Sequence, residues 1–105
     1  MPADKALRVT IYVNEADEWQ GKPLHLEILR YLQRDGHAGG TVLRGVAGFT
    51  QGAGVVTTSL VDAGGKLPLV IQFVDAGAAV ARALPQLRKM AGDRLITTEE
   101  VRIEP

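Results

Sequence analysis

The sequence alternates between strand-like and helix-like hydrophobic patterns, and the order of these patterns constrains the fold more than any other feature. Residues 7–13 alternate apolar and polar side chains, which is typical of a half-buried strand. Apolar residues then recur at helical spacing over residues 24–32, where Pro23 suits the start of a helix and Gly36 suits its end. The first third of the chain therefore predicts a strand followed by an amphipathic helix.

The rest of the chain predicts two strands, a second helix and a last strand. The two strands are expected at residues 41–46 and 69–74, and the nearly continuous apolar character of the latter is typical of a central strand covered by helices. Asp75 is a good N-cap for a helix that ends before Gly92. The last strand is expected at residues 95–103.

The predicted order is thus β-α-β-β-α-β. Each βαβ unit needs a right-handed crossover, which places both helices on one face of a four-stranded antiparallel sheet. We therefore predict one α+β domain over residues 1–105, a ferredoxin-like βαββαβ sandwich, with Val101 and Ile103 facing its core.

The strand at residues 69–74 carries apolar side chains on both of its faces. Val70 and Val74 point opposite to Leu69, Ile71 and Phe73 because side chains alternate along a strand. One apolar face would remain bare in a monomer. This pattern predicts an oligomer that packs sheet against sheet, as a symmetric dimer or trimer.

Composition excludes several classes of function. Twelve basic and twelve acidic side chains cancel, so the chain lacks the electrostatic footprint of nonspecific nucleic-acid binding, and no nucleic-acid partner is expected. The absence of cysteine excludes disulfides and thiolate metal sites. No apolar run approaches the roughly 20 residues of a membrane span, and residues 1–8 lack a signal-peptide pattern, so a cytoplasmic protein is expected.

Glycine is concentrated in residues 36–49, GHAGGTVLRGVAGF, which end in Phe49. Glycine in and beside a strand marks a bend, a bulge or a close approach to the main chain. Gly45, Gly48 and Phe49 either line a cleft for an effector or form a β-bulge in which the phenyl ring plugs the core. The long connection at residues 50–66, with a β-prone middle at 55–61, is typical of a functional loop.

Charged residues offer further candidates, each with two interpretations. Residues 92–94 form either an anion-binding turn or a plain helix stop. Arg44 makes either a salt bridge at a contact between subunits or a contact to phosphate. The cluster at Glu15, Asp17 and Glu18 is interpreted as a solvated acidic loop rather than a pair of acid–base carboxylates.

His25 and His37 lack a third metal ligand, so surface or capping roles are expected for both, and no metal site is predicted. Nor does any pairing of a nucleophile with a base emerge, because Ser59 has no histidine nearby. No catalytic residue is therefore assigned.

Four segments resemble the PII-like proteins, and most closely the domain-of-unknown-function family 190. They are GKPL at 21–24, the glycine-rich segment at 36–49, LPLVIQFVD at 67–75 and GDRLITTEEV at 92–101. The resemblance implies a homotrimer whose clefts between subunits bind a small effector, an adenine nucleotide in the PII signal transducers. It also implies that the loop at residues 50–66 contacts a regulated target, a membrane transporter or an enzyme.

Thr41, Gly48, Gly92 and Asp93 match the effector-binding pattern of that family, and Phe49 follows Gly48 as in its Gly-Phe step. The sequence also departs from the pattern. It has one extra residue before Gly48, no modifiable tyrosine in the loop, Arg94 and Leu95 in place of a glycine and a lysine, and no arginine-bearing tail. AMP or ADP needs less positive charge than ATP, and Arg44 and Arg94 are the candidates to supply it. The candidate effector-binding residues are therefore Thr41, Arg44, Gly45, Gly48, Phe49, Gly92, Asp93 and Arg94.

The leading hypothesis is a non-enzymatic PII-like regulatory protein that has no cofactor apart from its nucleotide effector. The alternative is a small oligomeric enzyme of the same architecture that acts on a small acid or carbonyl compound. A pocket that holds a histidine beside a buried carboxylate would favour the enzyme. A trimeric metal-tolerance protein is a third option, against which the absence of cysteine argues.

Overall fold

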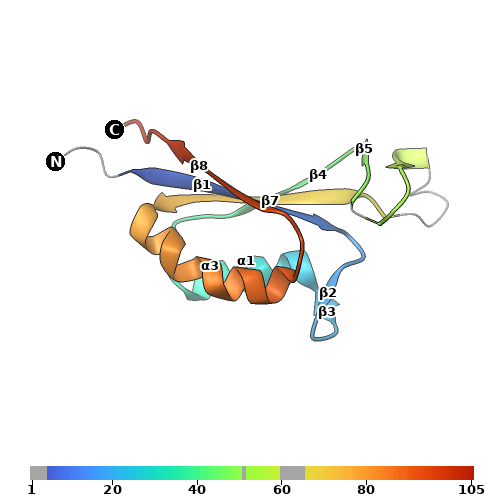
Figure 1. The fold of residues 1–105 in the computed structure, drawn as a ribbon, viewed down its shortest axis with the longest axis horizontal. Coiled ribbons are helices and arrows are strands. Elements are labelled where there is room, and N and C mark those ends of the chain that lie inside the picture. Colours follow the sequence, from blue (N-terminus) through green and yellow to red (C-terminus); the bar gives the residue numbers. More distant parts are fainter. Residues whose placement is uncertain (1–4, 51, 60–65) are drawn as a thin grey trace.

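A four-stranded antiparallel sheet with two helices on one face forms the protein. The computed structural model describes residues 5–50, 52–59 and 66–105. The order of strands in the sheet is β4-β7-β1-β8. These elements are β1 (Ala6–Asn14), β4 (Thr41–Arg44), β7 (Pro68–Ala76), β8 (Ile96–Val101), and the helices α1 (Leu24–Arg34) and α3 (Gly77–Ala91). Both helices lie on the same side of the sheet (Figure 1), so the predicted α+β arrangement is confirmed.

The core lies between the sheet and the helices. Alternate side chains of β1 and β7 face the helices, and the apolar stripes of α1 and α3 close over them. Burying each such side chain stabilises the fold by roughly 1.5–3 kcal/mol, which explains why the periodic pattern was informative. The fully buried large side chains are Val9, Ile11, Val13, Leu24, Ile28, Leu32, Ile71, Val80 and Leu87.

The opposite face of the sheet carries apolar side chains that remain partly accessible. Leu43, Val70 and Tyr12 are register partners across β4, β7 and β1, so they point to the same side. The exposed fractions are 52% for Leu43, 39% for Tyr12 and 37% for Val74. The predicted apolar character of both faces of β7 is confirmed, and the oligomer that would cover this face remains a prediction.

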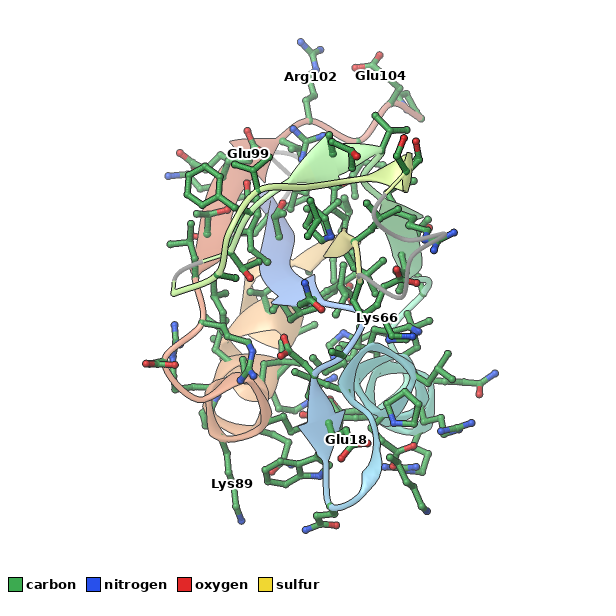
Figure 2. All side chains as sticks on the ribbon, turned by 90° about the vertical axis from the view of Figure 1, so that its right-hand side faces the viewer. Glu18, Lys66, Lys89, Glu99, Arg102 and Glu104 are labelled. Carbon is green, nitrogen blue, oxygen red and sulfur yellow. The ribbon has the colours of Figure 1, made fainter. Side chains whose placement is uncertain are left out.

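Two small ladders lie at the end of the sheet opposite the chain termini (Figure 1). The strands β2 (Glu18–Trp19) and β3 (Lys22–Pro23) form a hairpin directly before α1, and β5 (Ala47–Gly48) pairs with β6 (Val56–Thr57). Figure 2 looks onto this end and shows Glu18 on the helix side of the sheet and Glu99 on the other side. The strand predicted at residues 41–46 is shorter in the structure. It ends at Arg44, and β5 begins after Val46.

Two details of the predicted boundaries are wrong. Asp75 is not a helix cap, because β7 continues to Ala76 and the first helical N–H, that of Gly77, donates to the carbonyl of Lys5. Ile103 does not face the core, because β8 ends at Val101 and the Ile103 side chain is exposed. In both cases strand pairing, rather than local residue preference, decides where the element ends.

Candidate functional site

A pocket of about 620 Å³ lies at the end of the sheet that contains the C-terminal end of β1 and the start of β8. Its walls combine aromatic and aliphatic side chains from the open sheet face with the two loops that follow β5 and α3. The lining residues are Tyr12, Val13, Asp17, Phe49, Thr50, Pro68, Leu69, Val70, Asp93, Arg94 and Leu95. A concave, mostly apolar site with a few polar groups is the usual form of a small-molecule site.

The structure brings together three of the eight predicted effector-binding residues. Phe49, Asp93 and Arg94 all line this pocket although they come from distant parts of the sequence. Gly92 directly precedes them in the turn, whereas Thr41 and Arg44 lie on β4, outside the lining. The fold therefore brings the Phe49 segment and the turn after α3 together within one chain, whereas the family resemblance implied a cleft between subunits.

The predicted close approach at Gly45 and Gly48 exists, and its partner is Pro68. A Cβ atom on Gly48 would lie 3.0 Å from Pro68 Cγ, and one on Gly45 would lie 3.2 Å from the same atom. The Gly45 N–H donates to the Pro68 carbonyl over 2.9 Å. Both glycines thus let the chain bend over the start of β7, and Pro68 in turn forms part of the pocket wall.

Arg94 is already paired inside the chain. Its Nε donates to Asp17 Oδ2 over 2.8 Å, and its Nη1 donates to the Ala91 carbonyl over 3.0 Å. Burial raises the pKa of Asp17, but hydrogen bonds from Arg94 and from the Asn14 N–H, and the charge of Arg94, lower that pKa more, so it lies below its usual value. The hydrogen bond to Asp17 raises the pKa of Arg94 in turn.

The turn at residues 92–94 is a helix stop whose N–H groups are largely engaged. Gly92 has φ of 64° and its N–H donates to the Arg88 carbonyl, while the Arg94 N–H donates to the Ala91 carbonyl. The Arg88 guanidinium binds the carbonyls of Gly92 and Arg94 at 2.8 and 2.7 Å. These bonds favour the interpretation as a helix stop over an anion-binding nest.

The loop after β1 is more than a solvated acidic loop, which corrects our interpretation of Glu15 and Asp17. The Oε1 atom of Glu15 accepts from the Leu67 N–H at 2.9 Å and from Arg44 at 3.1 Å. The bond from Leu67 is the main reason that the pKa of Glu15 lies below its usual value. Arg44 therefore makes a salt bridge within the chain, while Glu18 is exposed as expected.

A buried polar cluster surrounds His37, which the sequence did not reveal. The surface role expected for His37 is therefore wrong. The His37 side chain is 0% exposed, with Nδ1 2.7 Å from Asp75 Oδ2 and Nε2 2.8 Å from Asp35 Oδ2. The imidazole edge meets the Phe73 ring at a centroid distance of 5.3 Å. Arg82 of α3 contacts Asp35 from the outside at 3.4 Å. The one available signal was Asp35, two residues before His37.

This cluster joins elements rather than presenting reactive groups. His37 also borders a second pocket of about 400 Å³ beside α1, but its side chain has no exposed surface and both ring nitrogens are occupied. Burial raises the pKa of Asp75, but hydrogen bonds from His37 and the Ala76 N–H, with nearby positive charge, bring that pKa below its usual value.

Neither a cluster of metal ligands nor a membrane-spanning helix occurs among the described residues. Among residues 5–50, 52–59 and 66–105, no three His, Asp or Glu side chains are grouped so as to hold a metal ion. None of the helices in those ranges has both the length and the apolar character that a bilayer span requires.

Comparison with known proteins identifies the family. The DUF190 family, described as "Uncharacterized ACR, COG1993", matches residues 6–103. The UPF0166 protein MJ1524 of Methanocaldococcus jannaschii is 32% identical over 83 residues, which are 79% of this chain and 76% of that protein. A UPF0166 protein of Aquifex aeolicus is 28% identical over 93 residues, covering 89% and 88% of the two chains. The match over nearly the whole chain confirms the resemblance, and this protein belongs to the DUF190 family.

Proposed function

We propose that this protein is a non-enzymatic PII-like regulator that binds a small effector in the pocket between Phe49 and the 92–94 turn. The observation that carries the proposal is the convergence of Phe49, Asp93 and Arg94 on one pocket. Tyr12 and Phe49 offer aromatic surface on which a planar base can stack. An adenine nucleotide with few phosphates, AMP or ADP, is the first candidate effector.

A homotrimer is part of the proposal. The partly exposed side chains Leu43, Tyr12 and Val74 supply an apolar sheet face for neighbouring subunits. Because Tyr12 also lines the pocket, subunits that pack on this face would complete the pocket walls. Effector binding and subunit association would then stabilise each other.

Transmission to a target is assigned to the 50–66 connection. Its described part begins next to the pocket at Thr50 and includes β6, which pairs with β5. Residue 51 and residues 60–65, including part of the β-prone segment 55–61, lie outside the described residues. The regulated target is a transporter or an enzyme that meets this loop in the cytoplasm.

The enzyme alternative is weaker than the regulator. His37 lies beside two carboxylates and borders a pocket, which is the feature that would favour an enzyme. Its imidazole nevertheless lies fully out of reach of a substrate, and each ring nitrogen is within 2.8 Å of a carboxylate oxygen. A general base needs a free nitrogen within hydrogen-bond reach of the substrate.

Isothermal titration calorimetry with AMP, ADP, ATP and cyclic AMP tests the proposal, alongside sedimentation for the trimer. Phe49→Ala should weaken binding at least about tenfold, since it removes one stacking surface worth roughly 1–3 kcal/mol per base. Val55→Ala is the control, because Val55 is an equally exposed apolar side chain outside the pocket lining. Absence of heat with all four ligands would refute nucleotide sensing, and a stable monomer at micromolar concentration would refute the trimer.

A further inference from the structure

Both arginines expected to meet an anionic effector are held by carboxylates of one short loop. Glu15 and Asp17, two residues apart after β1, bind Arg44 and Arg94 respectively. The side chains of the two carboxylates are 24% and 20% exposed. These are therefore solvent-accessible contacts that a ligand can compete for, unlike a fully buried pair.

The charges that line the pocket are unfavourable for phosphate. Among the described residues that line the pocket, Asp17, Asp93 and Arg94 carry a charge at neutral pH, and the charge of Arg94 is balanced by Asp17. A phosphate group that enters this site meets the carboxylates of Asp17 and Asp93, and the described lining residues include no cation besides the paired Arg94. Each added negative charge on the effector increases this repulsion.

We propose that Asp17 is a built-in competitor of the effector's phosphate: it holds the Nε–H of Arg94 and balances its charge, so an anion that binds Arg94 must compete with Asp17, and the pocket selects against effectors with more phosphates. This inference rests on the proposed function, because it assigns the specificity of the same pocket. Nucleoside or monophosphate is favoured over diphosphate and triphosphate by the difference in charge alone.

The same loop connects the pocket to the point where the chain enters β7. Asp17 Oδ2 accepts from the Asn14 N–H over 2.8 Å, and the Asn14 side chain contacts the carbonyl of Lys66 at 3.4 Å. Glu15 accepts from the Leu67 N–H and donates its own N–H to the Leu67 carbonyl. When an anion displaces Asp17 from Arg94, it therefore disturbs the loop after β1. This loop anchors Lys66, the last residue of the 50–66 connection, and Leu67, the first residue after it.

Asp17→Asn tests the competition directly. The amide keeps an oxygen that can accept from the Asn14 N–H but removes the negative charge. Calorimetry with adenosine, AMP and ADP should show that the affinity for AMP rises about threefold and that for ADP about tenfold, each measured relative to the affinity for adenosine. Glu99→Gln is the matched control, because it removes the charge of another arginine–carboxylate pair, with Arg8, outside the pocket lining, and should change none of the three affinities. The inference would be overturned if Asp17→Asn bound AMP and ADP with the same affinities as the wild type does.

A second measurement separates this inference from the proposed function. If no nucleoside or nucleotide binds any variant, the proposed function fails, and sodium pyrophosphate then serves as the probe. The NMR signal of the Arg94 Nε–H should respond at several-fold lower pyrophosphate concentration in Asp17→Asn than in the wild type and in Glu99→Gln. An identical response in all three proteins would overturn the role of Asp17. Asp17→Ser carries the same expectations if the asparagine variant does not fold.

Discussion

The Asp17–Arg94 pair and the Asp35–His37–Asp75 cluster have nearly equal contact distances and very different surroundings. The donor–acceptor distances are 2.8 Å in the pair and 2.7 and 2.8 Å in the cluster. Arg94 is 35% exposed and lines a pocket, whereas the His37 side chain is 0% exposed and packs on Phe73. The two sites also lie toward opposite ends of β7, near Pro68 and at Asp75.

This comparison separates a contact that can be exchanged from one that holds the fold. Water and ligands compete for the exposed pair, so its net contribution to stability is small. In the cluster the fully buried member is the His37 imidazole, for which water cannot compete, whereas the Asp35 and Asp75 carboxylates are 27% and 23% exposed. Removing the imidazole takes away the one contact that links these two carboxylates. Geometry alone therefore does not reveal the role of an ion pair, and burial does.

The largest effect is expected for His37→Ala. The change removes the buried imidazole that contacts both Asp35 and Asp75, although Asp35 keeps its contact with Arg82, and should lower the free energy of unfolding by about 3 kcal/mol, as for other broken buried pairs. Urea denaturation followed by circular dichroism measures it. His25→Ala is the control, since His25 Nδ1 has no hydrogen-bond partner among the described residues, and it should cost less than about 1 kcal/mol. Equal losses in the two variants would break the comparison.

The pH dependence of stability should further distinguish the buried cluster from the exposed pair. The pKa of Asp75 in the folded protein lies below its ordinary value of 3.8, so the unfolded chain binds a proton more readily. The stabilisation is complete above the unfolded-state pKa and is lost as pH falls through the folded-state pKa. Asp75→Asn lacks this contribution at every pH. The difference in unfolding free energy between wild type and variant should therefore shrink from pH 6 to pH 2, and a constant difference would contradict the assignment.

The smallest effect is expected for Arg94→Gln. The pair with Asp17 is partly exposed, so its loss should lower the free energy of unfolding by less than about 1 kcal/mol, and by less still in 1 M salt, where screening is strong. Urea denaturation at two salt concentrations provides the measurement. A loss as large as that of His37→Ala would show that the pair near the pocket is structural and that the proposed exchange with an anion is wrong.

The sequence predicted the sheet and helices better than the polar contacts. Alternation over residues 7–13 and helical spacing over residues 24–32 report burial of one face, which the fold then confirmed. The partners of His37 lie at Asp35, nearby in sequence, and at Asp75, far away, and only the second depends on how α1 packs against β7. Local pattern carries no information about that second contact.

The candidate site shows the same division. Family resemblance placed Phe49 and Asp93 in one site, and the structure brings both to one pocket. The same reasoning treated Arg44 and Arg94 as available cations, but Glu15 and Asp17 occupy them. Their pairing follows from the path of the loop after β1, which no periodicity describes.

By itself, the sequence determined the order of strands and helices and the apolar faces, because burial imposes a repeating pattern on neighbouring residues. The tertiary structure alone decided which charged groups meet, which of them are shielded from water, and why the glycines at 45 and 48 are needed beside Pro68. Those properties depend on distances between segments that are remote along the chain. They therefore arise only when the sheet and helices pack together.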